Sequence, residues 1–117
     1  MLYEYKAKAT DVYDGDTITV DIDLGFGIWM RRQKIRLRGI DAPEVRGLEK
    51  EAGLKSRDRV RELILGALVT LRTYKDSKEK YGRWLAEVYY MQKPYDPAEV
   101  LLNKQLLDEN LVVAMEG

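Results

Sequence analysis

Residues 18–24 read Ile18-Thr19-Val20-Asp21-Ile22-Asp23-Leu24, a strict alternation of apolar and polar side chains. Successive side chains of a strand point to opposite faces, so this pattern predicts a half-buried strand whose four apolar residues, Leu24 included, face the core. Gly25 and Gly27 follow as turn residues, and residues 31–39 alternate again, with Ile35 and Leu37 inward and Lys34, Arg36 and Arg38 outward. The two runs predict a long hairpin, preceded by a strand over residues 2–12.

The rest of the chain predicts a helix, a second hairpin and another helix. Residues 48–65 place small or apolar side chains at helical spacing, and Gly66 follows as a C-terminal stop. The members of this helical face are Leu48, Ala52, Ser56, Val60, Leu63 and Ile64. Residues 67–74 and 84–90 are rich in strand formers, which predicts the second hairpin. Asp96, Pro97 and Glu99 have the spacing of an N-cap, a first-turn proline and an N3 acid, so a helix is expected through residue 107. Residues 111–114 are expected to be extended.

This order of elements predicts one α+β domain, mainly β, over residues 1–117. Three strands, a helix and two strands suit a five-stranded OB-fold β-barrel with its helix between strands 3 and 4 and a second helix near the C-terminus. A generic α+β sheet is the alternative. With 45% hydrophobic residues in 117, the chain can build a single core.

Composition restricts the chemistry more than it restricts the fold. The chain has neither Cys nor His, which excludes the usual zinc sites, Cys nucleophiles and mechanisms that need a His base. Lys and Arg number 20, as do Asp and Glu, so the net charge is zero and any phosphate site must be local. The charges are segregated: residues 31–38 hold five cations and no acid, whereas acids gather at positions 14, 16, 21 and 23. Such segregation can place a cation site beside an anion site.

Signals for export or membrane insertion are not visible in the sequence. Residues 1–8 alternate polar and apolar side chains without the apolar run of a signal peptide, and no stretch approaches the roughly 20 apolar residues of a membrane span. We therefore expect an intracellular, monomeric protein with no membrane partner, although secretion of a longer precursor stays open.

The segment Asp14-Gly15-Asp16-Thr17 is the first candidate for chemistry. Asp14-Gly15 alone is typical of a tight turn. Counting back by twos from Ile18, however, places Asp16 on the inward face of its strand, where a carboxylate needs a cation or several donors. We favour a metal ligand at Asp16 over a structural acid.

Two further segments supply the remaining candidates. In residues 40–44, Asp41 could join Asp16 on one cation, and Glu44 could orient or deprotonate a water molecule; otherwise Asp41 begins a turn that Pro43 stiffens. In residues 80–83, Arg83 could grip a phosphate together with Arg36, because guanidinium groups bind phosphate in a bidentate manner. Taken singly, either arginine would be interpreted as a solvated surface charge.

Together the three segments resemble the staphylococcal nuclease (thermonuclease) family over residues 7–114. The resemblance implies Asp16 and Asp41 as calcium ligands, with the carbonyl of Ala42 as a main-chain ligand, and Asp14 as an acid that supports these ligands without touching the ion. Arg36, Glu44 and Arg83 would be the catalytic residues. Lys80 and Tyr81 match positions that contact a neighbouring phosphate.

The resemblance implies a nuclease that hydrolyses phosphodiester bonds of DNA and RNA with Ca²⁺ in preference to Mg²⁺. Products would carry 3′-phosphates, and single strands would be favoured because exposed bases can stack on aromatic residues. Two departures from the family concern Ala42, which stands where threonine is more familiar, and the absence of any Tyr after Tyr95, where relatives line a base pocket. The first hairpin is extended, so its Phe26 and Trp29 could contact substrate or a partner. The alternative function is a non-catalytic OB-fold module that binds nucleic acid or a protein.

Overall fold

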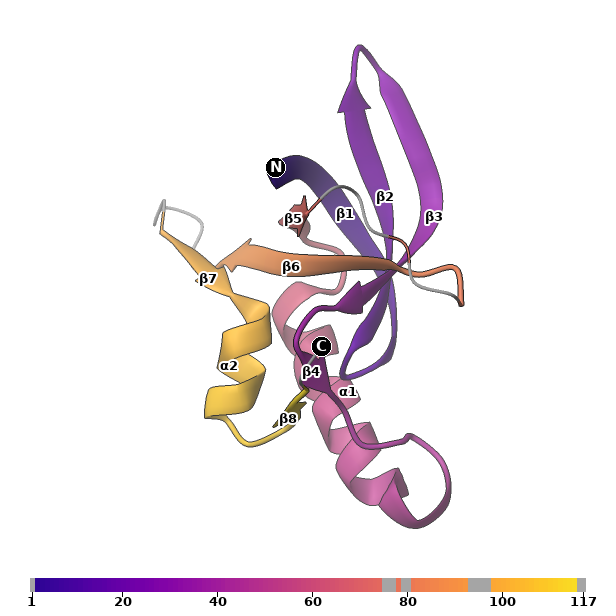
Figure 1. Cartoon of the computed structure of the whole chain (residues 1–117), viewed down its shortest axis with the longest axis vertical. Coiled ribbons are helices and arrows are strands. Elements are labelled where there is room, and N and C mark those ends of the chain that lie inside the picture. Colours follow the sequence, from indigo (N-terminus) through magenta and orange to yellow (C-terminus); the bar gives the residue numbers. More distant parts are fainter. Residues whose placement is uncertain (1, 75–77, 79–80, 93–97, 116–117) are drawn as a thin grey trace.

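The computed structural model describes residues 2–74, 78, 81–92 and 98–115 (Figure 1). Strands β1 (Leu2–Asp14), β2 (Thr17–Gly25) and β3 (Ile28–Leu37) form an antiparallel meander. Strand β5 (Leu68–Tyr74) pairs with β1, and β6 (Trp84–Met91) pairs with β5. A parallel pairing of β3 with β6 closes the circle. In this described part of the chain, five strands therefore make a closed mixed barrel, which confirms the predicted fold.

The helices lie outside the barrel. Strand β4 (Ile40–Asp41) and a 3-10 turn, η1 (Gly47–Glu49), lead into α1 (Lys50–Ile64), which connects the third and fourth barrel strands as predicted. Strand β7 (Glu99–Leu101) extends the sheet beside β6, and α2 (Leu102–Asp108) follows it. The expected extended piece near the C-terminus is β8 (Val113–Ala114), which pairs with β4. No helix in the described ranges has the length and apolarity needed to cross a membrane.

The alternation of β2 and β3 fills the barrel as expected, with one exception. The inward residues of both strands are buried, namely Ile18, Val20, Ile22, Ile35 and Leu37. Leu24 lines the same apolar cavity as Ile22, so its predicted face is correct, but it is 42% exposed and not buried in the core. It lies where β2 and β3 rise beyond the other strands as a projecting hairpin (Figure 1), and no opposing core remains there to cover it.

The two helical predictions need correction at their first turns. Leu48 is exposed because residues 47–49 form a 3-10 turn with a different periodicity. Ala52 lies in the first turn of α1 and is exposed, because the buried face of this helix begins at Gly53 and continues through Ser56, Val60 and Ile64. The second helix begins at Leu102 instead of near residue 97, and Glu99 belongs to β7. Pairing of Glu99 with Met91 of β6 overrides the local helix signal. Asp96 and Pro97 lie outside the described residues.

Candidate functional site

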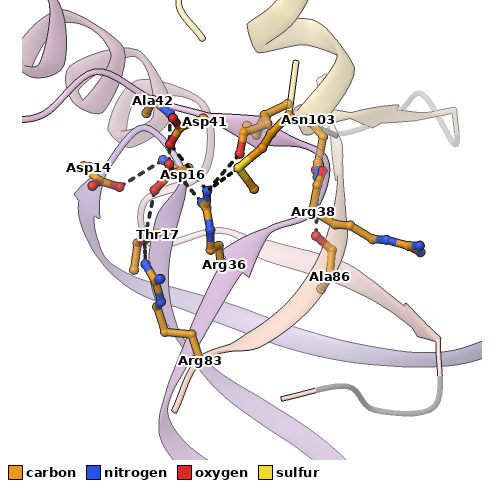
Figure 2. Close-up of polar contacts among 12 residues, drawn as sticks. Asp14, Asp16, Thr17, Arg36, Arg38, Asp41, Ala42, Arg83, Ala86 and Asn103 are labelled. Carbon is orange, nitrogen blue, oxygen red and sulfur yellow. Dashed lines mark hydrogen bonds and ion pairs between the residues drawn. The ribbon is translucent and has the colours of Figure 1, made fainter. Parts of the chain in front are cut away.

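The candidate site lies where the β1–β2 turn, the end of β3 and the start of β6 meet. Strand β2 pairs with β3 so that Thr17 stands opposite Arg36, and β3 pairs with β6 so that Arg36 stands opposite Leu85. Figure 2 shows the side chains of Asp16, Arg36 and Arg83 gathered around this junction. The register of three strands thus brings together residues from the three sequence segments.

Asp16 is the buried acid of the site. It is 5% exposed, as its inward phase predicts. One carboxylate oxygen, Oδ2, accepts a hydrogen bond from the Ala42 backbone N–H at 2.9 Å, and Oδ1 accepts one from the Thr17 hydroxyl at 3.0 Å. Burial raises the pKa of Asp16, but hydrogen bonds and the Arg36 charge outweigh this effect and hold the pKa below its ordinary value. Asp16 is therefore a carboxylate at neutral pH.

Asp14 lies beside Asp16 and behaves in the opposite way. Its Oδ1 accepts the Asp16 backbone N–H at 3.0 Å, which fixes the turn. Burial, together with the adjacent Asp16 carboxylate, raises the pKa of Asp14 to about 7. Because two acids share one turn, a cation placed there would relieve their repulsion.

We predict that Asp14 makes the metal-free protein less stable at alkaline pH. The pKa of Asp14 is about 7 in the folded protein and 3.8 ordinarily, so protonated Asp14 favours the folded state. This stabilisation is fully present below pH 3.8 and is lost as the pH rises through 7. In EDTA, the free energy of unfolding should fall by about 2 kcal/mol more in the wild type than in Asp14→Asn between about pH 5 and pH 8. Urea denaturation at several pH values measures this, and equal pH profiles would contradict it. The side-chain oxygen of asparagine can still accept the Asp16 N–H, so the Asp14→Asn variant keeps the turn and serves as the matched control.

Arg36 lies between the two predicted metal ligands. Its Nη1 is 2.9 Å from Oδ2 of Asp16, and its Nη2 is 3.4 Å from Oδ1 of Asp41. Nη2 also donates to the carbonyl of Ile40 at 3.2 Å and to the sulfur of Met115 at 3.5 Å. These neighbours leave Arg36 only 9% exposed, although its strand position points it away from the barrel interior. Both acids thus converge on one guanidinium group.

One nitrogen of Arg36 is incompletely satisfied. Among the described residues, Nη1 has no hydrogen-bond acceptor of correct geometry, although it forms the ion pair with Asp16. A buried guanidinium nitrogen without an aligned acceptor is unfavourable, since a lost hydrogen bond there is not replaced by water. The side chain therefore retains capacity for another oxygen ligand.

Thr17 joins the second arginine to this cluster. Its hydroxyl donates to Asp16 and accepts a hydrogen bond from Nη1 of Arg83 at 3.1 Å (Figure 2). The guanidinium of Arg83 lies 5.9 Å from the ring of Tyr81, which is 70% exposed. Arg36 and Arg83 therefore lie on the same side of the molecule. Lys80 falls outside the described residues, so its predicted phosphate contact has no structural description.

Glu44 follows Ala42 by two residues, and its backbone is fixed by contacts with the start of α1. Its side chain is exposed, and its backbone N–H donates to the Glu49 carboxylate at 2.8 Å. Helix α1 packs against the same segment: a Cβ added at Gly53 would lie 2.0 Å from the Glu44 carbonyl oxygen. Only glycine permits this approach, so Gly53 sets the path of the chain at Glu44.

We predict that Gly53→Ala is destabilising although it lies inside a helix. Alanine usually favours a helix over glycine by about 1 kcal/mol, but the clash with Glu44 should reverse the sign and cost about 1–3 kcal/mol. Any hydrolytic activity that depends on Glu44 should fall by roughly 10-fold or more, because small displacements are costly at a reacting centre. Urea denaturation and cleavage rates measure both effects. The exposed neighbour gives a matched control, Ala52→Gly, which should lose about 0.5–1 kcal/mol without loss of activity. A Gly53→Ala variant more stable than the wild type would contradict the role of this contact.

Three residues of the site were not predicted to have a role. Thr17 was visible within its motif, but only the structure shows that its hydroxyl links an acid to an arginine. Asn103 of α2 donates to the carbonyl of Arg38 at 2.8 Å (Figure 2). It also accepts the Val88 N–H at 3.0 Å, which ties the chain after β3 to β6. Met115 covers Arg36 from the C-terminal end. Neither Asn103 nor Met115 has a sequence signal, because both act through contacts distant in the chain.

The oxygens of this site suit a hard cation. Asp16 and Asp41 provide carboxylates, and Ala42 follows with a backbone carbonyl, which are the donors that Ca²⁺ prefers. Within the described residues, no group of three or more acidic, His or Cys side chains forms a ready cation cage. The raised pKa of Asp14 beside the Asp16 carboxylate, and the convergence of Asp16 and Asp41 on one guanidinium group, nevertheless show local acidity that a cation would neutralise. The residues present therefore fit a cation held by few protein ligands, with water completing its shell.

Comparisons with known proteins agree with this arrangement. A family model described as "Staphylococcal nuclease homologue" matches residues 34–116. A thermonuclease of Staphylococcus hyicus is 31% identical over an alignment of 117 positions, which covers 97% of this chain. The chain spans 57% of the length of that relative. On the barrel, the site geometry and these matches, the chain belongs to the staphylococcal nuclease family.

Proposed function

We propose that this protein is a calcium-dependent nuclease that hydrolyses phosphodiester bonds in single-stranded DNA and RNA and leaves 3′-phosphate ends. The observation that carries the proposal is the link from Asp41 through Arg36 and Asp16 to Thr17 and Arg83. Two acids and two guanidinium groups within one network suit a phosphate bound between a cation and arginines. Membership of a nuclease-type family supports the same reaction class.

Asp16, Asp41 and the Ala42 carbonyl would hold the cation, which would supply positive charge for the phosphate and bind water. Once these oxygens are engaged, Arg36 is attracted less strongly by the two carboxylates and can direct its N–H groups to a phosphate oxygen. The hydrogen bond to Thr17 holds Arg83 in place, and Arg83 donates to the phosphate from the start of β6. The two arginines then stabilise the charge that develops on the phosphorane.

Glu44 is the proposed general base. Its exposed carboxylate lies three residues after Asp41 in the chain and can take a proton from the attacking water. The new bond joins the water oxygen to phosphorus, and the bond from phosphorus to the 5′ oxygen breaks. The 5′ oxygen takes up a proton from solvent, and the phosphate stays on the 3′ side.

A cleavage assay tests this function directly. Labelled single-stranded DNA and RNA are incubated with the protein in calcium, in magnesium and in EDTA, and the product ends are mapped. Cleavage in calcium that disappears in EDTA and in Glu44→Gln, with unchanged circular dichroism, supports the nuclease. Tight binding of the same oligonucleotides without cleavage would instead support a non-catalytic nucleic-acid-binding barrel.

A further inference from the structure

The hairpin formed by β2 and β3 projects from the barrel as an arm (Figure 1). At its tip, Phe26 lies between two glycines and has a φ of 55°, a left-handed conformation that is unfavourable for a bulky residue. The ring is fully exposed, with a relative accessibility of 104%. Ile28 and Trp29 follow with exposures of 57% and 38%. A strained turn that exposes an aromatic ring to solvent is typical of a binding site.

A bulge in β3 places basic side chains on the face of the strand that continues from the hairpin tip. Ile22 pairs with Met30 and Val20 pairs with Gln33, so two residues of β3, Arg31 and Arg32, stand opposite Asp21 alone. Arg32 has a φ of 55°, a left-handed conformation that some β-bulges contain. The extra residue shifts the alternation by one position at the middle of the strand.

The shift places the functional residues on one face. Met30 and Ile35 line an apolar cavity inside the barrel mouth, and Gln33 accepts a hydrogen bond from Trp84 on the same side. The opposite, outward face of β3 therefore carries Trp29, Arg31, Lys34 and Arg36 in a row. Without the bulge, Trp29 and Arg31 would share a face with Ile35 instead of Arg36. The row begins at the tip of the arm and ends in the candidate site.

The acids on the arm do not cancel the charge of this row. Arg31 lies over the ring of Trp29 at 5.0 Å and pairs with Asp21 at 3.0 Å. Its side chain is 62% exposed, whereas that of Asp21 is 16% exposed, so the cation lies outermost. The second oxygen of Asp21 accepts the Arg32 N–H, and Asp23 accepts the Gly25 N–H. Lys34 and the side chain of Arg32 are exposed as well.

We infer that the outward row of β3, together with Phe26, binds the single-stranded continuation of a nucleic-acid substrate beyond the cleavage site. Bases stack on Trp29 and Phe26, and phosphates pair with Arg31, Arg32 and Lys34, an alternation that suits a single strand with exposed bases. Trp29 and Arg36 pair with Asp23 and Thr17, six steps apart on β2, so roughly 20 Å separates them and only an oligonucleotide of several units reaches both. This inference extends the proposed function from the reacting phosphate to the length of strand that is bound.

A second copy of the chain fits this surface less well. Pairing of two arms edge to edge would bring their arginines and lysines together, and the bulge interrupts the ladder that such pairing needs. A wholly apolar protein partner would leave the exposed cations without a counter-charge. Charge complementarity therefore favours nucleic acid.

Binding measurements in EDTA test the arm without any cleavage. Fluorescence anisotropy compares labelled oligothymidylates of about 16 and about 4 nucleotides. Trp29→Ala and Phe26→Ala should each weaken binding of the long oligonucleotide by about fivefold or more and reduce its advantage over the short one. Lys34→Gln should reduce the slope of log affinity against log salt by about 0.7, the value for one phosphate of a single strand. Leu65→Ala, which alters an exposed apolar residue outside the arm, should bind like the wild type.

The outcomes separate this inference from the proposed function. If the wild type cleaves DNA but the arm variants bind the long oligonucleotide as the wild type does, the arm inference is wrong and the nuclease stands. If the arm variants lose affinity although the wild type never cleaves, the arm binds nucleic acid and the nuclease proposal fails. Light scattering that shows a wild-type dimer dissociated by Phe26→Ala, with unchanged oligonucleotide binding, would assign the arm to self-association and overturn the inference.

Discussion

Replacing Arg83 by lysine is expected to lower kcat/KM for single-stranded DNA by about 10²–10³-fold, the usual effect of removing one preorganised donor to a developing charge. The guanidinium of Arg83 donates through Nη1 to Thr17, and its planar form holds its N–H groups in fixed directions. A lysine ammonium is a point charge on a flexible stem, so it keeps the charge but cannot keep both contacts in one geometry.

Single-turnover kinetics at saturating calcium separates this loss from a change in binding. The rate of the chemical step should fall, while the affinity for the oligonucleotide measured in EDTA should change much less, because the contact is made chiefly in the transition state. Arg72→Lys is the matched control, since Arg72 lies on β5 and bonds to Glu4, away from the cluster. If an Arg83→Lys variant cleaved DNA at the wild-type rate, the proposed catalytic role of Arg83 would be wrong.

Among the acids, Asp16 alone had a local signal for burial, and its 5% exposure agrees with that signal. The metal and catalytic roles of the acids stay predictions. The convergence of Arg36 and Arg83 depends instead on the parallel pairing of β3 with β6, which is set by barrel closure. The sequence could suggest that the two guanidinium groups share a phosphate, because both suit bidentate binding, but no local pattern shows that these two positions lie on the same side of the barrel.

The failures of sequence analysis share a physical cause. A capping pattern at residues 96–99 predicts a helix start, but β6 has a free edge that Glu99 pairs with, and Thr70 donates a hydrogen bond to the Glu99 carboxylate at 2.9 Å. The bulge at Arg32 is equally invisible, because both arginines fit a polar strand position. In each case a tertiary contact selects one of two locally acceptable conformations.

Arg36→Met is expected to destabilise the protein in EDTA by about 3–5 kcal/mol, because it removes one partner of a buried ion pair and leaves the other charged. The side chains of Asp16 and Arg36 are 7% and 11% exposed, so water cannot replace the lost guanidinium. Methionine keeps much of the length of arginine, which limits any cavity. Urea denaturation in EDTA measures the difference.

Calcium should restore much of the stability of Arg36→Met, since Asp16 and Asp41 would then be free to hold the ion without competition from a guanidinium. At a calcium concentration about 100 times the dissociation constant, an ion that binds only the folded state adds about 2.7 kcal/mol. The gain from calcium should therefore be larger in the variant than in the wild type, although the variant has lost a catalytic arginine. Arg59→Met serves as control: Arg59 also pairs with two acids, Glu62 and Glu109, but on the surface, so its loss should cost about 0.2–1 kcal/mol with no added response to calcium. If calcium stabilised Arg36→Met no more than it stabilises Arg59→Met, the two acids that converge on Arg36 would not be the ligands of the ion.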